Sequence, residues 1–498
     1  MTAAAERPSR DRSLAAAPDY ARGQLAVAST FAGVVALLLA TALLAALTRR
    51  GLYQDGAYYL YRLGEREWFY LVDPARTTVQ VLRQAPVVAL MKLGDASLPT
   101  LAVAFSLAML ALPIVITALT WIIAPRDARA FVLFPLLHLL AGYSTMDFDA
   151  VAEGAIGAAY CWVLLFLLVF RTRRILSQLV FVALCIPAFW LHEGLCVLMP
   201  CLLLAGALRL RTATTALERL FLLAVAVLVV AIIHYQLRWI IHPRILGERE
   251  SALQDLYGFH FIYHDGKLNI PAVSACVASL ALLWIFFAGA REPAAAGTAR
   301  LLAAGFAVLA VAMAPLPWLV ERCIAPHAQV AARYDPVFAS AALALVLLYA
   351  VATRLPTRRW ANGPSLVIVL TLALAQSSAD LAATARWRAY MADFSGRLSH
   401  LAGLVPWPST LATGDAARDA DWRMMSAGWV TPILSILLAP GGTVHAIIDY
   451  PADAWRPIEP ANVANLPKLR GITYAPYEQA LRGSDGVPAA AGNRPDTK

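Results

Sequence analysis

The chain has little charge, and this scarcity excludes a soluble protein. Only 15% of its 498 residues are charged, whereas 60% are hydrophobic and the mean hydropathy is +0.63. A soluble protein could not bury so much apolar surface. Lysine is also scarce, so arginines at the ends of predicted loops carry most of the net charge of +9. Such a distribution indicates membrane topology and no nucleic-acid-binding face.

Cysteine and histidine give no metal-binding pattern. The six cysteines lie mostly inside apolar runs, where a thiol behaves as a small hydrophobe, and no C-x-x-C spacing implies a disulfide framework or a metal site. His260 and His264 have the spacing of two metal ligands on a helix. No third ligand is adjacent, so we predict no metal there. Abundant arginine and alanine point to a GC-rich bacterial genome.

The chain contains many long apolar runs. A run of roughly 18 or more apolar residues predicts a helix that spans the membrane. We therefore predict an all-α polytopic membrane protein with about eleven transmembrane helices. The expected spans are 25–47, 98–124, 130–146, 151–170, 176–191, 194–208, 219–241, 270–289, 301–320, 336–353 and 364–380.

The loops between these spans orient the protein. Residues 1–24 form a polar tail, and the run 25–47 is too long for a signal-peptide core, which predicts an uncleaved anchor with a cytoplasmic N-terminus. Arginine clusters then fall in every expected cytoplasmic loop. A transmembrane domain over 25–380 is followed by a small extracytoplasmic region at 381–485 and a disordered tail at 486–498. The clustered loops are 125–129, 171–175, 209–218, 290–300 and 354–363.

The first outer loop, residues 48–97, is rich in aromatic residues. Rings with a polar tip favour the headgroup layer, so we expect one or two helices lying flat on the membrane. An aromatic belt with no other role is the alternative. The residues concerned are Tyr58, Tyr59, Tyr61, Trp68, Phe69 and Tyr70.

Asp55 is the candidate general base. It follows Gln54 and precedes Gly56, a few residues after the first span, and interface aromatics flank it. Partial desolvation raises the basicity of a carboxylate in such a place. The alternative is that Asp55 caps a helix N-terminus.

Two further groups of ionisable residues fall at the outer tips of short helical hairpins. Asp147, Asp149 and Glu153 could bind a divalent cation, orient an amine or hydroxyl, or cap a helix. His192 and Glu193 interrupt an apolar stretch, and an ionisable pair within a membrane points to function. A solvated hairpin tip is the alternative for this pair. We assign all five to substrate binding.

Basic residues on the same face could meet a phosphate. Arg333 and Tyr334 lie just before the tenth expected span, and Arg238 and Arg244 flank the loop 242–269. A guanidinium at that height fits a lipid phosphate. A salt bridge to Asp335 or snorkelling to the interface is the alternative for Arg333.

This arrangement resembles the GT-C superfamily of integral-membrane glycosyltransferases over about residues 1–380. The residues that carry the resemblance are Gln54-Asp55-Gly56 and, more weakly, the stretch from His327 to Arg333-Tyr334. Many members have a paired Asp-Asp or Asp-Glu, whereas Gln54 precedes Asp55 here. The WWDYG-type signature of oligosaccharyltransferases is absent, which makes transfer to asparagine unexpected.

The resemblance implies a hexosyl- or pentosyltransferase in a bacterial inner membrane. It would use a polyprenyl-phosphate-linked sugar and transfer the sugar to an envelope glycan, lipid or protein at the outer face. Asp55 would remove the acceptor proton while a basic group stabilises the leaving phosphate. The rival functions are a transporter or flippase of a lipid-linked or anionic substrate, and a non-catalytic scaffold for envelope assembly.

Overall fold

The computed structural model describes residues 17–53, 55–141, 153–172, 174–241, 263–264, 267–268, 335–352, 363–406, 430–449 and 458–483. The described chain is mainly helical, and six of its helices are long and apolar enough to cross a membrane. The protein is therefore a helical membrane protein, as its composition predicts. The six are Arg22–Leu47, Leu98–Ile123, Glu153–Phe170, Glu193–Leu210, Ala216–Trp239 and Ser365–Leu398.

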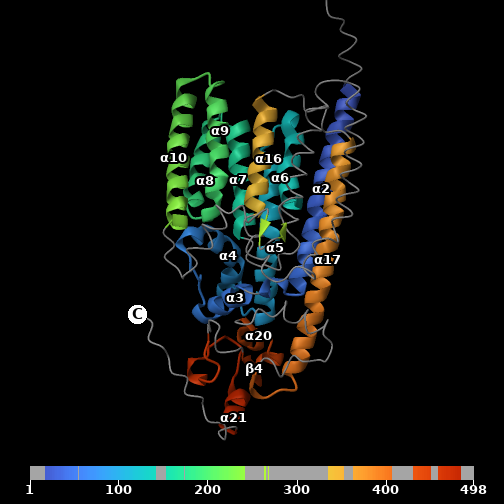
Figure 1. The fold of residues 1–498 in the computed structure, drawn as a ribbon, viewed down its shortest axis with the longest axis vertical. Coiled ribbons are helices and arrows are strands. Elements are labelled where there is room, and N and C mark those ends of the chain that lie inside the picture. The colour runs from blue at the N-terminus through green and yellow to red at the C-terminus, as the bar shows by residue number, and fades with distance from the viewer. Residues whose placement is uncertain are drawn as a thin grey trace, which may run out of the picture.

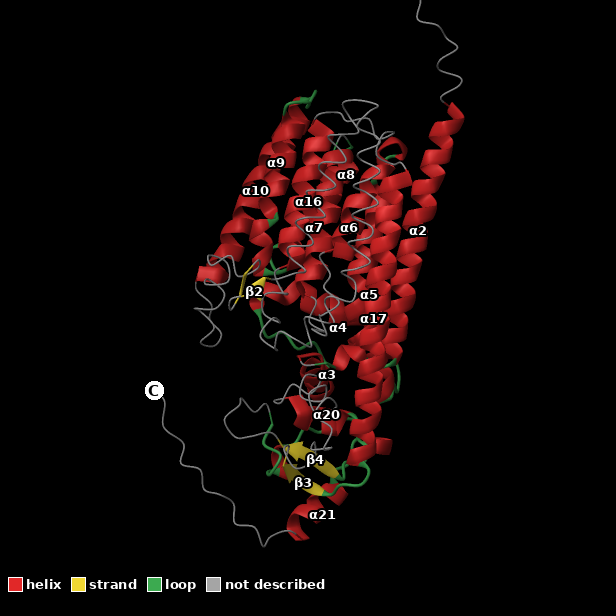
Figure 2. Cartoon of the chain, turned by 45° about the vertical axis from the view of Figure 1, so that its right-hand side comes forward, coloured by secondary structure: helices red, strands yellow, loops and turns green. Residues whose placement is uncertain are grey.

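The long helices form one bundle. Helix α5 packs between α2 and α7, α17 runs beside α2, and α9 pairs with α10 (Figures 1 and 2). Helix α7 is buried along nearly its whole length, so it forms the centre of the bundle. The helices are α2 (Ala17–Leu47), α5 (Leu98–Ile123), α6 (Leu133–Ala141), α7 (Glu153–Phe170), α8 (Ile175–Ala188), α9 (Met199–Leu210), α10 (Ala216–Ile241), α16 (Asp335–Ala352) and α17 (Gly363–Leu398).

The predicted spans on described residues coincide with helices, with two differences. Helix α6 is short and follows a 3-10 helix, η3 (Arg126–Val132). Helix α17 continues past residue 380 to Leu398, because residues 381–398 are rich in alanine and other helix formers even though they are more polar. The expected domain boundary at 380 thus falls inside a helix. The predicted spans 270–289 and 301–320 lie outside the described residues.

Segment 48–97 contains two helices, α3 (Asp55–Arg66) and α4 (Thr77–Leu93), as its aromatic pattern predicts. They are preceded by two 3-10 turns, η1 (Arg50–Leu52) and η2 (Pro74–Arg76). Both helices lie at one end of the bundle, opposite the beginning of α2 (Figure 1). Gly51 lets η1 approach α5 closely, because a Cβ at this position would lie 2.5 Å from the Cα of Ser106.

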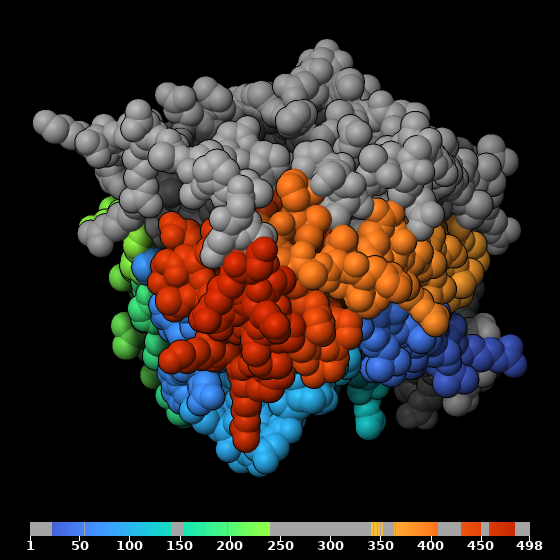
Figure 3. Space-filling view, turned by 90° about the horizontal axis from the view of Figure 1, so that it is seen from below, coloured from blue at the N-terminus to red at the C-terminus, as the bar shows by residue number. Residues whose placement is uncertain are grey.

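The C-terminal region lies beyond α3 at the same end. Strand β3 (Gly403–Pro406) pairs in parallel with β4 (Ala446–Asp449), and Gly403 stands opposite Ala446. Helices α20 (Thr431–Leu437) and α21 (Ala475–Gly483) pack around them. Seen from this end, the C-terminal residues overlie segment 48–97 (Figure 3). The other two strands, β1 (Tyr263–His264) and β2 (Lys267–Leu268), form an antiparallel pair.

One apolar cluster, which we call the junction core, joins this region to the bundle. It unites side chains of α3, the start of α5, the end of α17 and the C-terminal elements. Trp387 of α17 also donates a hydrogen bond from its indole nitrogen to the carbonyl of Thr48, at 3.1 Å. The C-terminal region and segment 48–97 are therefore packed as one body on the end of the bundle.

Replacing Phe394 by Ala should lower the free energy of unfolding by about 3–5 kcal/mol. Its ring is fully buried in the junction core, so truncation leaves a cavity. We expect a lower midpoint temperature of thermal unfolding in detergent. Leu381→Ala is the control, because that side chain lies on the same helix and is 43% exposed. Equal shifts in the two variants would contradict the packing described here.

Candidate active site

A cluster of charged side chains forms where segment 48–97 meets the bundle. We call it the Arg76 cluster: Asp73, Arg76, Arg83, Glu153 and Glu193. Four separate segments supply it. They are η2 with its N-cap residue, α4, the first residue of α7, and the first residue of η4 (Glu193–Val197).

The local sequence explains how η2 presents Arg76. Asp73 caps η2 by accepting a hydrogen bond from the backbone nitrogen of Ala75 at 2.8 Å, and Pro74 occupies the first helical position. The backbone nitrogen of Thr78 donates to the carbonyl of Trp190, and its hydroxyl donates to that of Pro187, both at 2.8 Å. These bonds hold the start of α4 against the end of α8 and the link that follows it.

Arg76 bridges two carboxylates from the bundle. Its Nη1 donates to Oε2 of Glu153 at 3.0 Å, and its Nε donates to Oε2 of Glu193 at 2.9 Å. Its Nη2 donates to the other oxygen of Glu193, so that pair is bidentate. Asp73 lies beside the same guanidinium, with its Oδ2 3.2 Å from Nε. The Glu153 side chain is 1% exposed and that of Glu193 12%, so both charges depend on this arginine.

Arg83 supplies the second positive charge to Glu153. Its Nη2 lies 2.8 Å from Oε1 of Glu153, and its side chain has no exposed surface. The guanidinium carbon lies over the ring of Tyr59, 3.9 Å from the ring centroid. A desolvated cation over an aromatic face is attracted by the ring quadrupole. The Nε of Arg83 has no hydrogen-bond partner within the described part of the chain.

Two glutamines on the same face of α4 hold the chain before Asp73. The side chain of Gln84 accepts from the backbone nitrogen of Tyr70 and donates to its carbonyl, both at 2.8 Å. Gln80 accepts from the backbone nitrogen of Val72 at 3.1 Å. Because both side chains are fully buried, this stretch has one fixed path into the cluster.

Asp55 interacts electrostatically with Tyr59, whose ring covers Arg83 of the cluster. It occupies the first turn of α3, where the helix dipole favours a negative charge, and Tyr59 follows one turn later. Burial raises the pKa of Tyr59, and the charges of Glu153 and Asp55 raise it further, while Arg83 and Arg76 lower it. The phenol of Tyr59 therefore responds to the charges of both Asp55 and Glu153.

The cluster carries an excess of negative charge when Asp73 is ionised, since three carboxylates face two guanidiniums. Burial raises the pKa of Asp73 to about 6, against the opposing effect of Arg76. Burial disfavours charge on Arg76, yet Glu193 and Glu153 raise its pKa well above the ordinary value. Arg76 thus remains charged, whereas Asp73 can take up or release a proton near neutral pH.

The structure brings together three of the predicted site residues, Glu153, His192 and Glu193, and Asp55 lies one helical turn before Tyr59, whose ring covers Arg83. His192 is 5% exposed, and its Nδ1 accepts a hydrogen bond from the backbone nitrogen of Gly194 at 3.0 Å. The tip at 192–193 is thus buried, and the alternative of a solvated hairpin is wrong. Six substrate-binding candidates remain, and only Arg238 among them is described; the other five, Asp147, Asp149, Arg244, Arg333 and Tyr334, lie outside the described residues.

Arg238 is exposed near the end of α10, and no contact between it and the Arg76 cluster is seen over the described ranges.

Sequence reasoning missed Asp73, Arg76 and Arg83. A usable signal was present, because polar residues at 80, 83 and 84 have helical spacing and share one face of an otherwise apolar helix. In the described part of the chain, no group of three or more His, Cys, Asp or Glu residues could hold a metal ion.

The fold and the cluster define a class: a polytopic helical membrane protein with a buried ion-pair cluster at one end of its bundle. Comparison of the chain with protein-family models, with curated proteins and with solved structures gives no match. The chemistry of this protein must therefore be argued from its own residues.

Arg83→Gln should lower the free energy of unfolding by about 3–5 kcal/mol, because it removes one partner of a fully buried ion pair. Arg482→Gln is the matched control. Arg482 pairs with Glu478 on the surface of α21, where an exposed pair contributes about 0–1 kcal/mol. The measurement is thermal unfolding of both variants in detergent. A shift for Arg83→Gln no larger than that of the control would show that Arg83 is not a buried partner of Glu153.

Ionisation of Asp73 should lower the free energy of unfolding as pH rises from about 4 to about 6. Its pKa is about 6 in the folded chain and 3.8 ordinarily, so the folded state holds the proton more tightly. We expect Asp73→Asn to be close to the wild type near pH 4 and more stable than it near about pH 7. Midpoint temperatures across this range check the sign. A wild type that gains stability relative to Asp73→Asn as pH rises would contradict it.

Proposed function

We propose that this protein is a membrane glycosyltransferase of the GT-C type. It moves a sugar from a polyprenyl-phosphate donor to an envelope glycan, lipid or protein. The observation that carries the proposal is a buried, arginine-bridged pair of carboxylates at one end of a membrane bundle, with Asp55 one helical turn before Tyr59, whose ring covers Arg83 of the cluster. A donor dissolved in the bilayer and an acceptor from water can both reach such a place.

The proposed topology puts this end at the outer face of a bacterial inner membrane. Eleven crossings leave the N-terminus in the cytoplasm and the C-terminal region in the periplasm. The start of α2 and the C-terminal strands lie at opposite ends of the molecule, as an odd number of crossings requires (Figure 2). Arginines in the short loops at the α2 start end agree with the positive-inside rule.

In the proposed reaction Asp55 removes the proton from an acceptor hydroxyl. The acceptor oxygen forms a bond to the anomeric carbon of the sugar, and the bond from that carbon to the phosphate oxygen breaks. Polyprenyl phosphate leaves with the electron pair. A guanidinium stabilises the charge that develops on the leaving oxygen.

The Arg76 cluster suits the binding of sugar hydroxyls. Its carboxylates accept hydrogen bonds, and Arg76, whose side chain is 26% exposed, donates them. The cluster lies at the ends of helices, because Glu153 begins α7 and Glu193 begins η4. Transporters usually place polar sites near the middle of the membrane, so this position favours an enzyme over a transporter or flippase.

Asp55→Asn should reduce sugar transfer by about 10²–10⁴-fold, the usual contribution of a general base. The assay uses membranes of a deletion strain that carries each variant, with a panel of radiolabelled polyprenyl-phosphate hexoses and pentoses. Transfer of label from lipid to envelope material is measured. Asp95→Asn is the control, because Asp95 is 86% exposed and pairs only at the surface with Arg470.

Two outcomes would contradict the proposal at different points. Unchanged transfer by Asp55→Asn would remove Asp55 as the base. No transfer by the wild type from any sugar of the panel would remove the glycosyltransferase itself.

A further inference from the structure

Two arginines share one face of the short 3-10 helix that follows α5. Helix α5 ends at Ile123, and η3 begins at Arg126 and includes Arg129. Residues three apart are eclipsed in a 3-10 helix, so the two arginines lie on one face and Asp127 lies on another. Helix η3 leads into α6 and packs against α2, at the end of the bundle opposite α3 and α4 (Figure 1). The pair is therefore separate from the Arg76 cluster.

Arg129 rests on an aromatic platform. Its guanidinium carbon lies 4.8 Å from the ring centroid of Trp121. That ring stacks in turn on Phe31 of α2, with the two centroids 4.9 Å apart. Because a cation is attracted to the face of an indole, these contacts hold the guanidinium where α2, α5 and η3 meet. Arg129 is partly exposed and Arg126 is exposed, so a ligand from outside can meet both.

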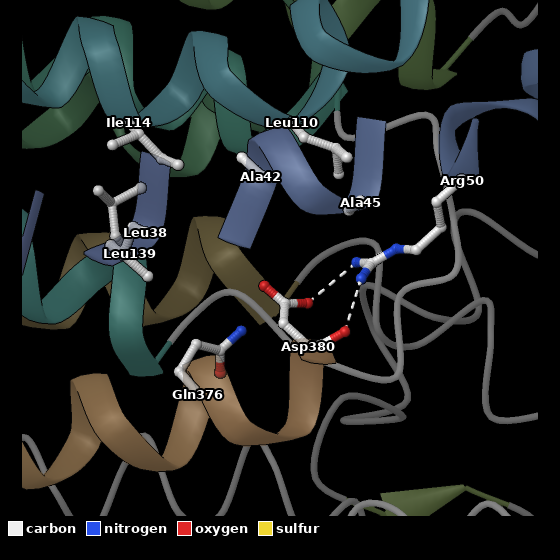
Figure 4. Close-up of a pocket in the computed structure, with 9 residues that line it drawn as sticks. All are labelled: Leu38, Ala42, Ala45, Arg50, Leu110, Ile114, Leu139, Gln376 and Asp380. Carbon is white, nitrogen blue, oxygen red and sulfur yellow. Dashed lines mark hydrogen bonds and ion pairs between the residues drawn. The ribbon is translucent and has the colours of Figure 1, made fainter. Parts of the chain in front are cut away.

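The charge of the two arginines is not neutralised by the part of the chain that the structure describes. Over these ranges neither side chain has a hydrogen-bond or ion-pair partner, and the Nε of Arg129 is buried. Other arginines near helix ends differ. Arg50, just beyond the opposite end of α2, has its Nη2 2.9 Å from Oδ1 of Asp380 (Figure 4). Arg171, at the same end as η3, donates from its Nε to the carbonyl of Ile123 at 2.6 Å.

The surface next to the two arginines is apolar. Leu119 and Ile122 lie one turn apart in the last part of α5, and they are 42% and 71% exposed. In a membrane bundle such a face contacts hydrocarbon. The arginines follow directly after the end of this apolar helix, which is the level of the lipid headgroups. A ligand at this place can therefore present a charged group to η3 and hydrocarbon to α5.

We propose that Arg126 and Arg129 bind the phosphate of an anionic phospholipid, such as phosphatidylglycerol, whose acyl chains lie along Leu119 and Ile122. Guanidinium forks match phosphate oxygens, and a phosphate between two like charges relieves their repulsion. A zwitterionic lipid fits less well, because its ammonium group would meet two cations. Free phosphate has the charge but no chain to cover the face of α5. The site does not depend on the proposed glycosyl transfer.

Photolabelling of the full-length protein in phosphatidylcholine nanodiscs tests the proposal. The probe is phosphatidylglycerol with a diazirine in one acyl chain, and labelled peptides are identified by mass spectrometry. We expect label on the last turns of α5, at Leu119 and Ile122. The double variant Arg126→Gln, Arg129→Gln should lose roughly fivefold or more of this label, because it removes both charged donors.

The matched control is the double variant Arg174→Gln, Arg211→Gln. Both residues are exposed in short loops at the same end of the bundle, beside α8 and α9 (Figure 1). The control thus removes the same charge from the same end of the protein and should label as the wild type does. Equal labelling of the two double variants would overturn the site, because it would mean that the lipid is held only by the general charge of this end.

The single variant Arg126→Gln keeps the test decisive if the double variant fails to fold. Arg126 is exposed, so its loss leaves the packing intact, and labelling should fall roughly two- to fivefold. Labelling equal to that of the wild type would overturn the proposal.

Two further arms test the kind of ligand. Equal labelling of α5 by the matching phosphatidylcholine probe would overturn selection of an anionic lipid. Competition by inorganic phosphate as strong as competition by unlabelled phosphatidylglycerol would overturn a lipid as the source of the phosphate.

Discussion

The guanidinium of Arg76 is the interaction on which the rest of this end of the molecule depends. It neutralises Glu153 and Glu193, which come from different parts of the bundle and are both largely withdrawn from water. Without it, Glu193 would lose its guanidinium partner, and Glu153 would keep only Arg83. The planar fork of arginine meets both groups at once, and the compact ammonium of lysine could not reproduce that geometry.

This one contact has structural consequences beyond electrostatics. Because Arg76 belongs to segment 48–97 and its partners belong to the bundle, the pairing fixes the segment on the bundle end. Gln80 and Gln84 of α4 then bind the backbone of the preceding stretch, at Val72 and Tyr70. The junction core packs the C-terminal region against the same end of the bundle. Asp55 stands at the start of α3, one helical turn before Tyr59, whose ring covers Arg83. A buried ion pair adds little net stability but strongly specifies one arrangement.

The sequence predicts the class of this protein and much of its helix order, because long apolar runs leave the chain few alternatives. It also predicts that Glu153, His192 and Glu193 share a face with Asp55, since alternating crossings return each tip to the same end. It does not predict Arg76 and Arg83 as their partners. Both arginines resemble ordinary loop and interface charges, and only tertiary packing reveals which ones are buried. The sequence also does not predict that α17 continues to Leu398. Hydropathy shows where an apolar span ends, but a helix can continue beyond that point.

The most direct measurement of the central claim is a double-mutant cycle on Arg76 and Glu193. The free energy of unfolding would be compared for Arg76→Gln, Glu193→Gln, the double variant and the wild type, in detergent at one pH. The account predicts a coupling of about 1–3 kcal/mol, with the double variant less damaged than the sum of the single ones. Additive effects would contradict it, because they would mean that Arg76 does not bridge segment 48–97 to the bundle.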